Sequence, residues 1–172
     1  MASIYQPGEE RLGRALALLV ALRDPMNGEH SAAVNTLHET VKASNNNREF
    51  GLLMLHIFVH GARYGLAGDV RQLAGILVKN ECIGMFNIGN STQLAEDLSS
   101  EEAKTLLDTL QASILEGLSD GLSEIRRMNA ALLGKIASCY VGDYWVPLIP
   151  VIISEIQTIL SGNYDDQAAK DN

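Results

Sequence analysis

The chain has 172 residues and carries 21 acidic against 13 basic side chains, which gives a formal net charge of −8. An acidic chain in which only 5% of the residues are aromatic is poorly suited to gripping a phosphate backbone or to stacking single-stranded nucleic acid. Two cysteines are too few for a disulfide framework, so a reducing compartment is expected. The apolar runs at 15–22 and 146–153 are too short to span a bilayer, so we expect no membrane insertion.

Apolar residues recur at helical spacing through the first half of the chain. The three stripes, in chain order, are Leu12, Leu16 and Leu19, then Val34, Leu37, His38 and Val41, then Phe50, Leu53, Met54 and Ile57. Turn-forming residues at 24–28 and the polar run at 44–47 separate them. The sequence therefore predicts three amphipathic helices, followed by a break at 61–68.

The most informative stretch is the predicted helix over 69–82. Its apolar stripe consists of Val70, Leu73, Ala74 and Leu77, and its polar residues are Arg71, Gln72, Lys79 and Asn80. A related pattern returns at Ile125-Arg126. Two helices with the same pattern indicate an internal repeat, which is typical of binding scaffolds rather than of enzymes.

The second half begins with a less regular segment at 84–98, interpreted as a long connection. Ser99 and Glu102 form a capping box, which predicts a helix start. The next two predicted helices, separated by a turn at 119–121, have these apolar stripes: Ala103, Leu106, Leu107, Leu110 and Ile114, then Ile125, Met128, Leu132 and Ile136. A last helix is expected over 149–160, and the polar tail 163–172 is expected to be disordered.

These helices are expected to pair into hairpins, with Val34-Asn35, Val70-Arg71 and Ile125-Arg126 at equivalent positions of the second helices. The first spacing is close to that of two-helix repeats, roughly 34 to 47 residues. The predicted fold is all-α: an α-α superhelix, or HEAT-repeat solenoid, of antiparallel pairs with about three repeats and part of a fourth over residues 1–162. Since the apolar last helix lacks a polar outer face, the chain is expected to be the N-terminal piece of a longer protein.

The motif residues resemble those of a known family. The stretch 70–80 resembles the pattern in karyopherin-β (importin-β) nuclear transport receptors, in which an Arg-x-x-Ala segment runs into Leu-x-Lys-Asn. Further matches are Phe50, Ile125-Arg126 with Ile136-Ala137, and Trp145 followed by Leu148-Ile149-Pro150. The likeness follows the helix order over about 9–160 and is greatest to the transportin branch.

This resemblance implies a stack of HEAT repeats whose second helices line a concave face and hold the small GTPase Ran in its GTP form. It implies that Lys79 and Asn80 contact Ran, and that cargo proteins and nucleoporins bind through the full-length receptor. It implies no enzyme activity, no cofactor, and shuttling between cytoplasm and nucleus through the nuclear pore. The recurring Arg71 and Arg126 are expected to bridge successive repeats instead of touching a ligand.

Two alternatives remain open at this point. One is a HEAT or armadillo scaffold of another kind, such as a phosphatase-subunit or trafficking adaptor that ignores Ran. The other is an all-α enzyme that uses His56 and His60, which lie one helical turn apart and could face a metal. A zinc protease motif would need glutamate after the first histidine, where the chain has Ile57, so a structural role for the pair is expected.

Overall fold

The computed structural model describes residues 5–43, 48–82 and 100–139, together with 149–150, 152–154 and 156–157. Within these ranges the chain is helical and contains no strand, so the prediction of an all-α fold is confirmed. The α-helices are α1 (Glu9–Arg23), α2 (His30–Ala43), α3 (Arg48–His60), α4 (Gly68–Leu77), α7 (Ser100–Leu118) and α8 (Ser123–Cys139). Two short elements join them: the 3₁₀ helix η1 (Gly61–Tyr64) and the π-helix η2 (Val78–Cys82).

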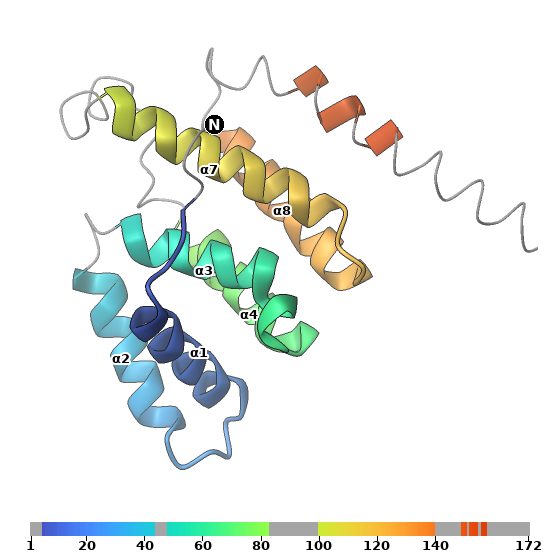
Figure 1. Ribbon diagram of the computed structural model, residues 1–172. Coiled ribbons are helices and arrows are strands. Elements are labelled where there is room, and N and C mark those ends of the chain that lie inside the picture. The colour runs from blue at the N-terminus through green and yellow to red at the C-terminus, as the bar shows by residue number, and fades with distance from the viewer. Residues whose placement is uncertain are drawn as a thin grey trace, which may run out of the picture.

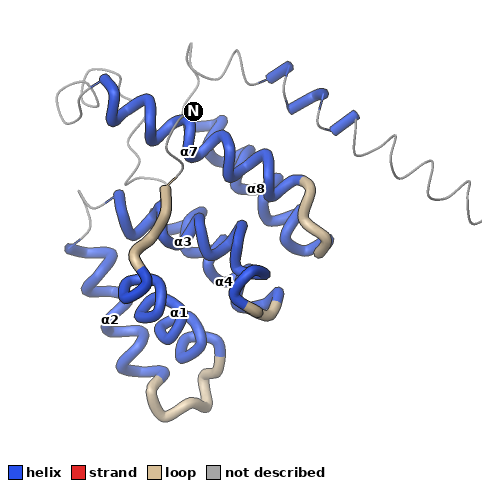
Figure 2. The backbone as a smooth tube through the Cα atoms, viewed as in Figure 1, coloured by secondary structure: helices blue, strands red, loops and turns tan. Residues whose placement is uncertain are grey.

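Three helical hairpins lie one above another in the order of the sequence (Figure 1). They are α1 with α2, α3 with α4, and α7 with α8, and each pair is in contact along its length. Figure 2 shows the short loops that join the first pair and the last pair. The first loop is held by asparagine and aspartate side chains that accept backbone N–H groups: Asp24 from Met26, and Asn27 from Glu29, each at 2.9 Å. The predicted pairing and these turns are therefore confirmed.

The second and third hairpins stack in register, but the first does not. First helix contacts first helix (α3 with α7), and second helix contacts second helix (α4 with α8). In the first hairpin it is α1 that lies against α4 and α3, while α2 packs mainly on α1. The three second helices therefore do not form one continuous row, as the resemblance implied, because the first hairpin is turned relative to the other two.

The contact face of α2 also differs from the predicted stripe. Ala33 is buried, and Leu37 and Val41 pack against the core, whereas Val34 and His38 are exposed. The predicted face was wrong by about one residue position, because a small alanine lets α2 approach α1 closely on that side. Spacing alone could not distinguish these adjacent faces.

Helix α3 is the centre of the core. Every residue from Phe50 to His60 is buried except the partly buried Leu52, since α1, α4 and α7 all contact this helix. The predicted stripes of α1, α4 and α8 also face this core, with Leu19, Ala74 and Ile125 fully buried. The core thus joins all three hairpins.

Some predictions fall outside the described residues. These are the connection at 84–98, the capping residue Ser99, Trp145 to Leu148, the tail 163–172, and the side chains of Ala103, Leu106, Leu107 and Ile136. The described residues between 149 and 157 are helical, as predicted, and Ile149, Ile153 and Ile156 are exposed. Among the helices that the structure describes, none has the length and apolar character needed to cross a membrane.

Candidate protein-binding surface

Lys79 and Asn80 lie on the π-helical turn η2, which continues α4 without a break. The turn is anchored by Val78, whose side chain is fully buried and whose N–H donates to the carbonyls of Ala74 and Gly75. Lys79 is half-buried and Asn80 is exposed. A single π turn at the end of an α-helix is unusual and occurs often at functional sites, since it redirects the side chains it carries.

The Lys79 ammonium is not used by the fold in the part of the chain that the structure describes. No hydrogen bond or ion pair there engages it, whereas five arginines on α1 and α4 and in η1 are paired with carboxylates. A lysine near a helix C-terminus is favoured by the helix dipole. Since no described residue competes for it, this ammonium can pair with an acidic partner protein.

Further exposed residues lie on α4 and on α8, two helices that pack side by side. Ile76 lies one helical turn before Asn80 and is exposed, and Arg127, Ala130 and Ala131 are exposed on α8. We call these six residues the second-helix surface: Ile76, Lys79, Asn80, Arg127, Ala130 and Ala131. Three of these residues are apolar or small and three are polar or charged, a composition suited to contact with another protein.

Arg71 lies near the start of α4, at the other end of the helix from Lys79 and Asn80, and is a structural residue. Only 1% of it is exposed. Its Nε donates to the carbonyl of Phe58 and its Nη2 to that of Val59, both at 3.1 Å, which satisfies two carbonyls in the last turn of α3. The same guanidinium forms an ion pair with Asp120 in the turn between α7 and α8. Arg71 therefore ties the second hairpin to the third, as the sequence predicted.

Asp120 is held as a carboxylate by several donors. Its Oδ1 accepts the N–H of Leu122 at 2.9 Å, and both of its oxygens face the Arg71 guanidinium. Burial by itself would raise the pKa of Asp120. The hydrogen bonds from Arg71 and Leu122, with the charges of Arg71 and Arg126, outweigh burial and lower this pKa below its usual value.

Arg126 does not repeat the role of Arg71. Its Nη1 donates to the backbone carbonyl of Asp120 at 2.6 Å, so the contact that the structure describes stays inside the third hairpin. The expectation that Arg126 bridges successive repeats was wrong for this contact. The reason is geometric: Asp120 lies in the turn that precedes α8, within reach of both arginines.

His56 and His60 lie side by side on α3, with ring centroids 4.6 Å apart. The Nε2 of His56 is 2.8 Å from the Tyr64 hydroxyl, and the Nδ1 of His60 is 3.0 Å from the Glu116 carboxylate of α7. Glu116 also pairs with Arg63 at 2.7 Å. His60 thus takes part in a polar contact between the second and third hairpins, whereas the His56 contact with Tyr64 lies within the second.

This environment favours neutral imidazoles. Burial, helped by the charges of His60 and Arg63 and opposed by Glu116, lowers the pKa of His56 to about 4. Burial also lowers the pKa of His60. Neither histidine belongs to a group of three or more metal-ligating side chains in the described residues. The pair has the structural role that the sequence analysis expected.

Comparison of the chain with protein-family models, with curated proteins and with solved structures gave no match. The likeness to nuclear transport receptors therefore rests on the residues of the chain, chiefly those at 70–80. Sequence reasoning found Lys79, Asn80 and the bridging Arg71, but it treated Asp120 only as a turn former. The sequence did contain a sign that Asp120 could pair with an arginine, since this acid lies in the turn before the helix that carries Arg126.

Proposed function

We propose that this chain is the N-terminal region of an importin-β-like nuclear import receptor, and that it binds the small GTPase Ran in its GTP form. Such a receptor shuttles between cytoplasm and nucleus, and it would take up cargo proteins and nucleoporins through the full-length protein. In this proposal the hairpins are HEAT repeats that act as a non-enzymatic scaffold. The resemblance at 70–80 names the partner, and the stacked hairpins are compatible with such a scaffold.

One observation supports the proposal more than any other. Within the motif 70–80, the fold uses the side chain of Arg71, whereas those of Lys79 and Asn80 lie at the outer end of the motif. Arg71 is fully engaged with α3 and Asp120, whereas Lys79 is without an ion pair among the described residues and Asn80 is exposed. A repeat motif that served packing alone would not need Lys79 and Asn80 at its outer end.

The expected interface with the partner consists of one ion pair, a few hydrogen bonds and one apolar contact. Lys79 can form an ion pair with a carboxylate of the partner, and Asn80 can both donate and accept hydrogen bonds. The exposed Ile76 beside them would supply apolar contact. In a chain with a net charge of −8, the long-range interaction with an acidic partner is repulsive, so affinity must come from these local contacts.

The test is a titration of the purified chain with Ran loaded with GTP and with GDP, followed by calorimetry or fluorescence anisotropy. The GTP form is expected to bind, and the GDP form to bind at least about tenfold more weakly, a difference of roughly 1.4 kcal/mol. Lys79→Glu should weaken binding by about tenfold or more with unchanged helicity. Lys42→Glu is the matched control, because Lys42 is exposed on α2, away from the second-helix surface. Equal or absent binding of both Ran forms would overturn the proposal.

A second candidate is a helical-hairpin adaptor that has no connection with nuclear transport. The apolar and small residues of the second-helix surface favour a protein partner without specifying Ran. This candidate predicts a chain that ignores both forms of Ran. If a partner is then isolated, Lys79→Glu and changes at Ile76 should still weaken its binding.

A further inference from the structure

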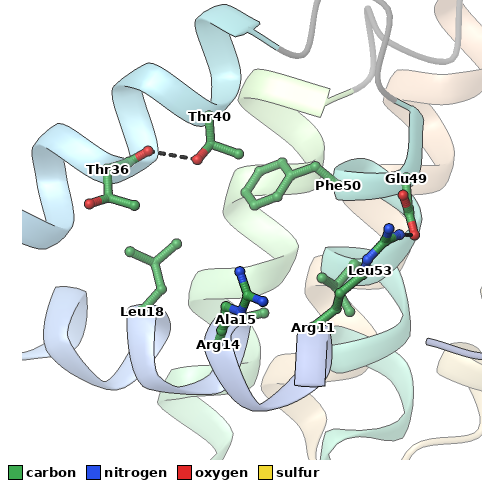
Figure 3. A pocket seen from close by; sticks show the side chains of 9 residues that line it. All are labelled: Arg11, Arg14, Ala15, Leu18, Thr36, Thr40, Glu49, Phe50 and Leu53. Atoms are coloured by element: carbon green, nitrogen blue, oxygen red, sulfur yellow. Dashed lines mark hydrogen bonds and ion pairs between the residues drawn. The ribbon is translucent and has the colours of Figure 1, made fainter. Parts of the chain in front are cut away.

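A groove opens in the first hairpin, away from the second-helix surface. It has a volume of about 490 Å³ and lies between α1, α2 and the start of α3. Its lining residues are Arg11, Arg14, Ala15, Leu18, Thr36, Thr40, Glu49, Phe50 and Leu53, as Figure 3 shows. The groove exists because α2 packs mainly on α1 and leaves space on its side that faces α3.

The groove has an apolar floor and polar walls. Ala15 and Leu18 from α1 meet Phe50 and Leu53 from α3 at its base (Figure 3). On the opposite side α2 contributes the hydroxyl of Thr40, which donates to the carbonyl of Thr36 at 2.7 Å. A space of this size with a few polar groups around an apolar base suits one or two large side chains of a ligand.

The lining holds one more basic than acidic side chain, although the chain is acidic. Two arginines and one glutamate line the groove, in a chain whose acidic residues outnumber the basic ones by 21 to 13. Arg11 pairs with Glu49, and Arg14 pairs with Glu10. Both pairs are exposed, with 60% of the Arg11 side chain and 74% of the Arg14 side chain in solvent.

These surface pairs leave room for another carboxylate. Exposed ion pairs contribute little to stability, about 0–1 kcal/mol, so their rearrangement is inexpensive. Each guanidinium has five N–H donors, and the ion pair of Arg11 and that of Arg14 each use one nitrogen. A ligand carboxylate can therefore bind Arg11 or Arg14 while the present partner stays in place.

We propose that this groove binds a short acidic peptide segment of a partner protein, with a large apolar side chain on the Phe50 and Leu53 floor and a flanking carboxylate on Arg11 or Arg14. A nucleic acid is disfavoured, because only two arginines are present and the net charge of the chain is −8. A basic peptide is disfavoured because the lining offers a single acid, Glu49, against two arginines. The site shares no residue with the proposed Ran surface.

The probe is a random peptide library of about twelve residues displayed on phage, selected on the full 172-residue chain. Enriched peptides are expected to combine Asp or Glu with a large aliphatic or aromatic residue. Their affinities are then measured by fluorescence anisotropy with synthetic copies. Binding should weaken with added salt, since exposed charge pairs are screened.

Two variants test the position of the peptide. The double change Arg11→Gln with Arg14→Gln removes the charge from the rim, and Thr36→Tyr fills the groove from α2. Each is expected to weaken binding by at least tenfold. Val34→Tyr, on an exposed position of the same helix outside the groove, and Arg127→Gln on α8 should leave binding unchanged.

Several outcomes would overturn the proposal: no enrichment, enrichment of peptides without acidic residues, or peptides that bind the groove variants as tightly as the parent chain. Concentration-dependent dimers that Thr36→Tyr dissociates would assign the groove to a second copy and equally overturn it. Failure here is distinguishable from failure of the Ran proposal, because the groove variants should not alter the Ran titration and Lys79→Glu should not alter peptide binding.

Discussion

The exchange Arg71→Met is the sharpest test of how the hairpins are held together. Arg71 is 1% exposed and its partner Asp120 has a side chain that is 13% exposed. Methionine would fill much of the space but would leave the Asp120 carboxylate and the carbonyls of Phe58 and Val59 without their donor. Breaking a buried ion pair by removing one partner costs about 3–5 kcal/mol, a large part of a typical folding free energy of about 5–15 kcal/mol.

The assay is urea unfolding followed by circular dichroism, for Arg71→Met, Asp120→Asn and the double variant. We expect Arg71→Met to lose about 3–5 kcal/mol, and thermal unfolding to shift down by roughly 10 °C, at about 2–4 °C for each kcal/mol. The double variant should be less damaged than the sum of the single losses, because the two residues share one interaction. Arg127→Met is the control, on an exposed position of α8. A loss below about 1 kcal/mol for Arg71→Met, or strictly additive losses, would refute the reasoning.

Two further predictions concern pH and close helix contacts. The pKa of His56 is lowered to about 4 in the folded chain from about 6.5 when unfolded. The contribution of neutral His56 to the free energy of unfolding is therefore complete above about pH 6.5 and is lost as the pH falls toward 4, by up to roughly 3 kcal/mol. His56→Gln should flatten the pH dependence of stability measured by urea unfolding, whereas His38→Gln, at an exposed position, should not. Parallel pH profiles for the two variants would contradict this prediction. Gly117→Ala should lower the melting temperature, because the new Cβ would lie 2.8 Å from buried Asn129 atoms. Gly134→Ala has open space around the new Cβ and should stabilise the chain by about 0.4–1 kcal/mol. Equal shifts of the melting temperature for the two variants would show that the α7–α8 contact is looser than described.

The helices and their pairing could be predicted because each depends on neighbouring residues. The period of the apolar stripes specifies helix, and the turns at 24–28 and 119–121 contain the residue types that end one helix and begin the next. The bridging role of Arg71 followed from its position in a repeat. Its burial did not, since its partner Asp120 lies 49 residues away in the sequence.

Features that depend on how the helices meet were not predictable in this way. The period of α2 did not distinguish the buried Ala33 face from the exposed Val34 face, because adjacent faces of a helix differ only in which neighbour they meet. The π turn that presents Lys79 and Asn80 was likewise missed. A helical period carries no sign of one wider turn, which forms where tertiary contacts, here the burial of Val78, hold the chain in place.

The sequence by itself determined an all-α chain of paired amphipathic helices, and it named Lys79 and Asn80 as the residues most suited to a partner. Local periodicity and turn chemistry carry the information for the helices, because they act between residues close along the chain, whereas Lys79 and Asn80 were implied by the family resemblance. Only the tertiary structure decided that the first hairpin is rotated relative to the other two, that Arg71 forms a buried ion pair with Asp120, and that a groove opens between α1, α2 and α3. Those outcomes depend on side-chain volume and charge brought together from separate hairpins, and no short segment of the chain contains both partners.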